Sequence, residues 1–193
     1  MNALWRAIAI LIDPFAEWKR IEQESGDPAY LMSRYVALLA CVPAVFGFIG
    51  ACIVGVVVPG SGEVERASLT DGLFGAVFGY AAAFVSVFLL GLIINAFAPA
   101  FGGRRDFASA LKLAVYSHTP VWLAGIFLIL PGLRFLTFTG FYGAYLLWRG
   151  LPLLMKVPEH KSQTFAVLLV ACAFALTSIA GAVQHAVFGT PGL

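Results

Sequence analysis

The feature that most constrains this chain is a run of 18 residues, 113–130, without a charged side chain. An α-helix rises about 1.5 Å per residue, so such a run can cross a hydrocarbon core of about 30 Å. Four further apolar stretches accompany it, and 61% of the chain is hydrophobic while only 11% is charged. Soluble domains average about 25% charged residues. The sequence therefore predicts an all-α, polytopic membrane protein: a five-helix transmembrane bundle with a short N-terminal interfacial helix.

Turns and polar loops separate the five predicted spans. The spans cover about residues 35–58, 72–98, 113–130, 133–148 and 165–188. We expect residues 1–30 to form a cytoplasmic or interfacial helical segment and residues 31–193 to form the transmembrane domain. Pro43 and Pro120 should kink the first and third spans, because proline removes a backbone donor and clashes with the preceding turn.

The first 30 residues contain no predicted span. The apolar stretch at residues 4–12 is short and contains Arg6, so we expect it to lie in the interface. Asp13 and Pro14 then predict a helix start. Trp18 lies on this second helix among charged residues, a pattern typical of helices anchored at a membrane surface by tryptophan. An ordinary solvated helix is the alternative.

Lysine and arginine residues are distributed unequally between the predicted loops. With a cytoplasmic amino terminus, ten of the twelve fall on the cytoplasmic side, and only Arg66 and Arg134 fall outside. Cytoplasmic loops carry such an excess. The sequence therefore predicts a cytoplasmic amino terminus, a carboxyl terminus outside and an odd number of spans. The basic turn with Arg104 and Arg105 is a candidate for binding lipid head groups, although the charge asymmetry alone accounts for it.

Spans of alternating direction place five polar residues at a similar depth near the cytoplasmic side: Asn95, Tyr116, His118, Thr119 and Tyr145. Three of them belong to the third span, which we expect to be the inner helix because polar groups facing lipid are costly. Within that helix Tyr116 and Thr119 share one face and His118 lies nearly opposite. Two interpretations stay open. The cluster is interhelical hydrogen-bond contact, or it is a water-accessible pocket in which His118 titrates or binds a ligand.

Several chemistries lack their signatures. No Asp or Glu lies within the predicted spans and no Lys or Arg lies deep in one, which argues against proton-coupled transporters and intramembrane aspartyl enzymes. Motifs of zinc hydrolases, serine hydrolases and P-loop proteins are missing. Cys41, Cys52 and Cys172 lack the spacing of a metal site. We expect a protein that is not an enzyme, with no catalytic residues, metal or cofactor, and a net charge of +2 gives no reason to expect nucleic acid.

Small residues recur at every fourth position in the first two spans. They are Gly47, Ala51 and Gly55 in the first and Gly75, Gly79 and Ala83 in the second. Such stripes let helices approach closely in a membrane. Membrane lipids are therefore the expected partners, together with a homo-oligomer assembled through these faces.

Short motifs along the chain resemble a known family. They are Pro14, Trp18 and Ile21 in the spacing P-x-x-x-W-x-x-I, YSHTPVWLAG at residues 116–125, GFYGAY at 140–145 and GLP at 150–152. Over essentially its whole length the chain resembles the bacterial branch of the Yip (Ypt-interacting protein) family. The resemblance implies a five-span protein of the bacterial inner membrane with a cytoplasmic amino terminus. Eukaryotic members are associated with small-GTPase binding through a longer cytosolic arm and an Asp-Leu-Tyr-Gly-Pro-type motif. This chain lacks both, so GTPase binding is not expected.

Two functions from different classes follow from this reading. The first is a non-enzymatic protein that organises the membrane or recruits partners. The alternative is a small-solute or ion channel or transporter, with Asn95, His118 and Tyr145 lining a polar vestibule on the cytoplasmic side.

Overall fold

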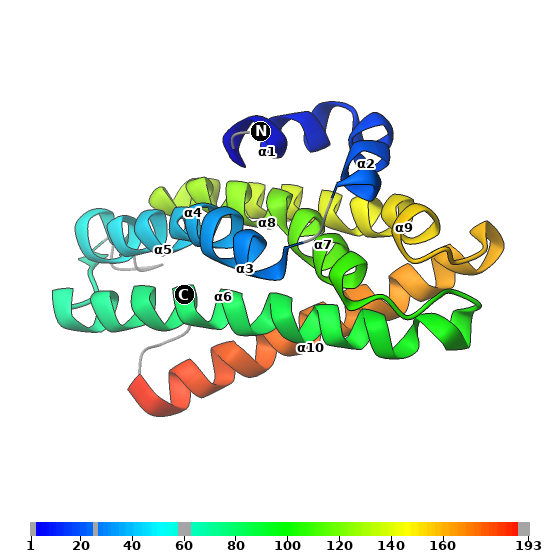
Figure 1. Ribbon diagram of the computed structural model, residues 1–193. Helices are drawn as coiled ribbons and strands as arrows, with labels where there is room; N and C mark the ends of the chain where they lie inside the picture. Colours follow the sequence, from blue (N-terminus) through cyan, green and yellow to red (C-terminus); the bar gives the residue numbers. More distant parts are fainter. Residues whose placement is uncertain (1–2, 25–26, 58–62, 189–193) are drawn as a thin grey trace.

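The described part of the chain is almost entirely helical. The structure, a computed structural model, describes residues 3–24, 27–57 and 63–188. Figure 1 shows α1 (Ala3–Ile12) and α2 (Pro14–Gln23) along one side of a helical bundle, with α10 (Glu159–Phe188) on the opposite side. Together with its apolar helices, this architecture confirms the prediction of an all-α polytopic membrane protein.

Four helical segments in the described ranges are long and apolar enough to cross a membrane. They are Pro28–Val54, Leu69–Phe101, Phe107–Ile129 and Glu159–Val187. The fourth predicted span, about 133–148, falls on two shorter helices in series, the 3₁₀ helix η5 (Pro131–Phe141) and the α-helix α9 (Tyr142–Leu154). Their combined rise of about 40 Å is also long enough to cross, although neither helix is long enough alone.

Several spans are assembled from short helical pieces. The first span contains α3 (Pro28–Tyr30), η1 (Leu31–Val36), α4 (Ala37–Leu39), α5 (Cys41–Phe48) and η2 (Ile49–Val54). The second contains α6 (Leu69–Phe97) and η3 (Ala98–Phe101). The third contains α7 (Phe107–Ser117), α8 (Thr119–Ala124) and η4 (Gly125–Ile129). A two-residue pair of antiparallel strands, β1 (Val56–Val57) and β2 (Val64–Glu65), follows the first span.

The two expected proline kinks fall beside interruptions of the helices. The α-helix of the first span is interrupted at Ala40, and Pro43 lies in the first turn of the next piece. The third span is interrupted at His118, and Pro120 is the second residue of α8. Both prolines lie in the first turn of a helical piece, where backbone amides have no partner within the helix. The missing N–H of proline therefore costs no hydrogen bond there.

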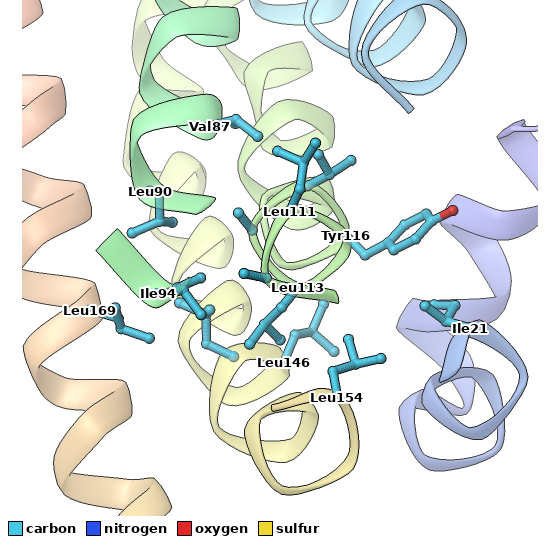
Figure 2. Close-up of a cluster of buried hydrophobic side chains, with 14 of the residues drawn as sticks. Ile21, Val87, Leu90, Ile94, Leu111, Leu113, Tyr116, Leu146, Leu154 and Leu169 are labelled. Carbon is cyan, nitrogen blue, oxygen red and sulfur yellow. The ribbon is translucent and has the colours of Figure 1, made fainter. Parts of the chain in front are cut away.

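α7 is the central helix of the bundle. Every residue from Ser109 to Ser117 is buried. Buried residues make up 61% of an apolar 18-residue stretch of Phe107–Ile129 but only 11% of such a stretch of Glu159–Val187. Figure 2 shows side chains of α2, α6, α9 and α10 around Leu111 and Leu113 of α7; the surrounding side chains include Ile21, Leu90, Ile94, Leu146 and Leu169. The expectation that the third span is the inner helix is therefore confirmed.

Two glycines of α9 allow it to lie close against α7 and α2. A Cβ atom added at Gly143 would lie 2.4 Å from the carbonyl oxygen of Ser117. A Cβ atom added at Gly150 would lie 2.5 Å from a methyl carbon of Leu113 and 3.0 Å from the Trp18 ring. Any larger residue at either position would push α9 away from the central helix.

Candidate functional site

Tyr116 and Thr119 lie on the side of the inner helix that faces the first span and the N-terminal helices. The Tyr35 and Thr119 hydroxyl oxygens are 2.7 Å apart and form a buried hydrogen bond. The Tyr35 and Tyr116 rings are 4.8 Å apart, edge to face. Tyr116 also lies 6.3 Å from the ring of Trp18. These contacts join three separate segments of the chain.

His118 lies on the other side of the same helix, as its position in the turn predicts. Its Nδ1 atom is 2.9 Å from the carbonyl oxygen of Ala114. Because a carbonyl can only accept, this contact assigns the proton to Nδ1 and leaves Nε2 of the neutral ring as an acceptor. His118 lines a groove of about 270 Å³, here called the His118 groove, whose walls come from α6, α8 and α10. Its lining includes Gly79, Ser86, Trp122, Thr177, Gly181 and Gln184.

Asn95 and Tyr145 belong to neither group. The Asn95 side-chain oxygen is buried, with no hydrogen-bond partner among the described residues. Tyr145 is 40% exposed and packs beside Tyr142 and Trp148 on α9. The prediction that these residues gather with His118 in one cluster is therefore wrong. Asn95 and His118 also differ in level along the bundle. Gly91 of α6 packs against Leu111 of α7 and Val87 shares the groove with His118, so Asn95, four residues beyond Gly91, lies toward the start of α7.

Trp18 is also not where the sequence suggested. Its side chain is fully buried, against Gly150 and Tyr116, so the prediction of an interfacial anchor at this residue is wrong. The apolar face of α2 covers protein instead of lipid. The exposed tryptophan of the N-terminal segment is Trp5 on α1, which is 67% exposed. The same outward face of α1 carries Leu4, Ile8 and Ile12.

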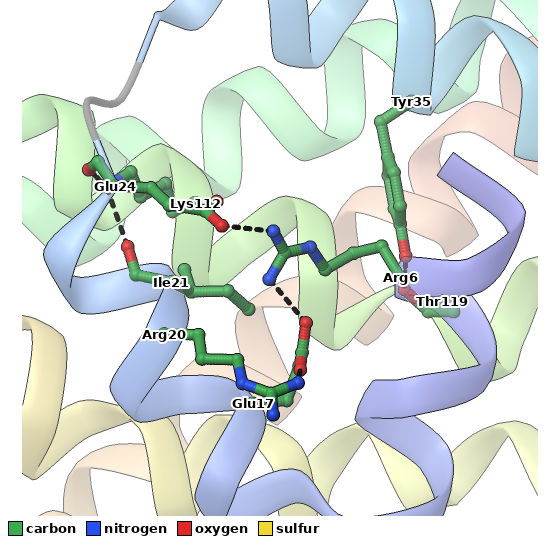
Figure 3. A network of polar contacts seen from close by, with 8 residues as sticks. All are labelled: Arg6, Glu17, Arg20, Ile21, Glu24, Tyr35, Lys112 and Thr119. Atoms are coloured by element: carbon green, nitrogen blue, oxygen red, sulfur yellow. Dashed lines mark hydrogen bonds and ion pairs between the residues drawn. The ribbon is translucent and has the colours of Figure 1, made fainter. Parts of the chain in front are cut away.

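Figure 3 shows a buried group of charges, here called the docking network, between the two N-terminal helices and the bundle. Arg6 of α1 forms ion pairs with Glu17 and Glu24, and Glu17 also pairs with Arg20 at 3.3 Å. Arg6 is 5% exposed and Glu17 only 1%. Burial alone would lower the pKa of Arg6, but the hydrogen bond to Glu24 and the two carboxylate charges outweigh it and raise that pKa.

Lys112 of the inner helix completes the docking network. Its ammonium group donates to the carbonyl oxygens of Ile21, at 2.9 Å, and of Glu24. These carbonyls belong to the C-terminal end of α2, where backbone acceptors have no partner within the helix. A cation is also favoured there by the helix dipole. Lys112, which is far from α2 in the sequence, therefore caps the C-terminal end of α2.

The sequence reading missed Lys112 as a site residue because it assigned this residue to a cytoplasmic loop. The helix begins at Phe107, and Lys112 is 5% exposed within it. Lys112 is therefore buried near the start of the inner helix, just before the predicted span 113–130. Asp106 accepts a hydrogen bond from the Ser109 amide as the helix N-cap, and an Asp before an apolar run is a signal for such a start.

The two arginines predicted to bind lipid head groups differ from each other. Arg104 pairs with Asp106 at 3.1 Å, so its charge is partly neutralised. Arg105 is exposed. Burial alone would raise the pKa of Asp106, but hydrogen bonds from Ser109 and the nearby cations lower it below its ordinary value. The basic turn is therefore tied into the helix start.

Metal-binding groups do not gather in the part of the chain that the structure describes. Within those ranges no three His, Cys, Asp or Glu side chains come close enough together to hold a metal ion. Cys41, Cys52 and Cys172 are unpaired. The charged side chains of the docking network neutralise one another where the N-terminal helices meet the bundle. Other hydrogen-bonding side chains line the His118 groove.

Comparison with known proteins gives a consistent picture. The model of the Yip1 domain matches residues 8–180. The chain is 26% identical over 190 residues to the protein named "Inner membrane protein YohC" of Escherichia coli strain K12, with 93% of this chain and 95% of that protein covered. The protein of the same name from Escherichia coli O6:H1 matches equally. No solved structure matches.

Proposed function

We propose, on the premise that this chain belongs to the Yip1 domain family and is an integral membrane protein, that it organises the membrane without being an enzyme, by associating with further copies of itself. The observation that carries this proposal is the His118 groove. Gly79 and Gly181 lie on its walls, and a Cβ atom added at either would meet nothing within 4 Å. The groove is therefore open where a second helix needs space.

Two of the helices that border the groove, α6 and α10, belong to the least buried of the four long apolar segments. In the most apolar part of Leu69–Phe101 and of Glu159–Val187, 22% and 11% of the residues are buried. In lipid no hydrophobic force drives helices together, so small residues that permit close packing decide where they associate. The predicted small-residue stripe of the second span lies here, since Gly79 and Ala83 both line the groove.

Polar side chains in the groove would strengthen such an association. Ser86, Thr177 and Gln184 line it together with His118. Interhelical hydrogen bonds in membranes contribute about 0.6 kcal/mol each on average. A helix of a second copy offers partners for these groups that lipid tails do not.

Orientation and location are part of the same proposal. Ten of the twelve lysine and arginine residues fall on one predicted side, which supports a cytoplasmic amino terminus and a carboxyl terminus outside. The relative named as an inner membrane protein supports the inner membrane of a bacterium as the location.

Cysteine cross-linking in native membranes tests the self-association. In a background where Cys41, Cys52 and Cys172 are replaced by Ser, we expect Gly181→Cys to give disulfide-linked dimers on mild oxidation. Ile179→Cys is the matched control, since Ile179 lies two residues away on the same helix and is 62% exposed. Dimers from both positions alike, or from neither, would contradict the proposal.

A second candidate is favoured by one observation, the polar lining around His118. His118, Ser86 and Gln184 line the same groove. Such a polar lining suits the passage of a small solute or ion. Purified protein in liposomes distinguishes this function. Solute flux abolished by His118→Ala supports a channel or transporter, and flux equal to that of empty vesicles excludes it.

A further inference from the structure

Two cations each contact the same aromatic ring where α2 packs on α9. The ammonium nitrogen of Lys19 lies 4.2 Å from the centre of the Phe15 ring. The guanidinium carbon of Arg149 lies 5.6 Å from the same centre and 5.9 Å from the centre of the Trp148 ring. The two cations are therefore no farther apart than the sum of their distances to Phe15. We call these four residues the cation–aromatic patch.

The charges of the patch are not neutralised within the described protein. Neither Lys19 nor Arg149 lies within ion-pair distance of a carboxylate among the described residues. The nearby carboxylates pair elsewhere: Glu17 with Arg6 and Arg20, Glu22 with Lys156, and Glu24 with Arg6. Two like charges at this separation repel each other. Aromatic faces offset part of that cost, and a bound anion would offset the rest.

An apolar groove begins beside the patch. It lies between α9 and α10, measures about 310 Å³, and exposes an apolar surface. Trp148 belongs both to this groove and to the patch. The other walls include Tyr145 of α9 and Ala166, Val167 and Val170 of α10. Because the chain is an integral membrane protein, such a surface faces acyl chains.

We infer that the patch and the groove together bind one anionic phospholipid. The phosphodiester lies near Lys19 and Arg149, and an acyl chain lies along Tyr145 and Val170. Arginine offers a planar set of donors that matches phosphate oxygens, and lysine adds a point charge. Trp148 at the groove mouth suits the head-group level of a bilayer. A free phosphate ion would contact only the patch. The apolar groove is therefore what makes the site specific for a lipid.

Lipid binding to the purified full-length protein in detergent, measured by native mass spectrometry, tests this inference. We expect phosphatidylglycerol to bind more tightly than phosphatidylcholine with identical acyl chains. Lys19→Gln and Arg149→Gln should each weaken phosphatidylglycerol binding about fivefold. A basic residue near an anionic lipid contributes about 1 kcal/mol, which corresponds to that change in affinity. The double variant should weaken it about 25-fold if the two contributions add. Arg34→Gln is the matched control, an exposed arginine of the first span outside the patch, and should change binding little.

Further measurements distinguish binding of the whole lipid from binding of its head group alone, and loss of charge from damage to the fold. Inorganic phosphate at millimolar concentration should not displace phosphatidylglycerol. Lys19→Arg keeps the charge and should keep the binding, which shows that a loss in Lys19→Gln reflects charge. Phosphatidylglycerol with a photoreactive acyl chain should label the unmodified protein on the α9 and α10 peptides that contain Tyr145 and Val170.

Four results would overturn the inference. They are equal binding of phosphatidylcholine, an equal loss in Arg34→Gln, displacement by inorganic phosphate, and photolabelling confined to other helices. If the Gln variants unfold, the unmodified protein still decides the matter through the photolabel and the comparison of the two lipids.

Discussion

The ammonium group of Lys112 donates a 2.9 Å hydrogen bond to the carbonyl oxygen of Ile21, joining the inner helix to the end of α2. A lysine inside a membrane-embedded helix is costly unless it is paired. Here the cost is met by backbone carbonyls that themselves need a donor. One contact therefore satisfies two groups and attaches the N-terminal helices to the bundle.

Replacing Lys112 should loosen α2. Lys112→Met leaves the carbonyls of Ile21 and Glu24 without their donor, and an unsatisfied buried group costs about 1–3 kcal/mol. Hydrogen–deuterium exchange of α2 amides should become faster while exchange in α7 changes little. Lys112→Arg keeps the donor and is the control. Unchanged exchange in Lys112→Met would show that the contact does not attach α2.

Breaking the Arg6–Glu17 pair from one side should be strongly destabilising. Glu17→Leu leaves Arg6 buried beside a single remaining partner, and losing one member of a buried ion pair costs about 3–5 kcal/mol. The double variant Arg6→Met/Glu17→Leu should recover part of this loss, since the charges that then lack a partner, Glu24 and Arg20, are exposed. Chemical denaturation in detergent measures the free energy of unfolding. Glu159→Gln, at an exposed carboxylate of α10, should have no effect, and a double variant worse than both single variants would contradict the network.

The Tyr35–Thr119 hydrogen bond should appear as a coupling energy. Tyr35→Phe and Thr119→Val each remove one hydroxyl of the 2.7 Å contact. A double-mutant cycle on the free energy of unfolding should give about 0.6 kcal/mol, with about 1.7 kcal/mol as the largest value seen for such pairs in membranes. Tyr30→Phe on the exposed start of the first span is the control. Additive effects of the two variants would mean that the hydroxyls do not interact.

Asp106 should make the stability of α7 depend on pH. Its pKa is lowered in the folded protein, so the unfolded state binds the proton more tightly. The stabilisation is then fully present above the unfolded pKa and is lost as the pH falls through the folded one. Thermal unfolding between pH 6 and pH 3 should show a smaller loss for Asp106→Asn, which keeps a capping oxygen without a titrating charge. Equal losses in both proteins would remove Asp106 as the cause.

Local patterns predicted those features that depend on one helix alone. The 100° rotation per residue placed His118 opposite Tyr116 and Thr119, and the structure agrees because that geometry is internal to a helix. The polar groups of this span on two faces indicated neighbours on both sides, as the buried run from Ser109 to Ser117 confirms. The two prolines likewise act on their own backbone.

Features that depend on which helices meet were beyond such patterns. Trp18 and Ile21 form an apolar face that suits lipid and protein equally, so the amphipathic pattern could not show that α2 covers Gly150 and Tyr116. Arg6 within a short apolar run indicated an interfacial segment, and its partners Glu17 and Glu24 could not be distinguished in sequence from solvated charges.

From the sequence alone came the membrane class, the helical content and the positions of the apolar segments, because the length and hydropathy of a segment decide whether it suits a bilayer. Only the tertiary structure decided that Lys112 and Arg6 are buried at the N-terminal helices, and that His118 is separated from Asn95 and Tyr145. The reason is physical: burial and pairing depend on the rotation and approach of neighbouring helices, and these are set by contacts between residues far apart in the chain.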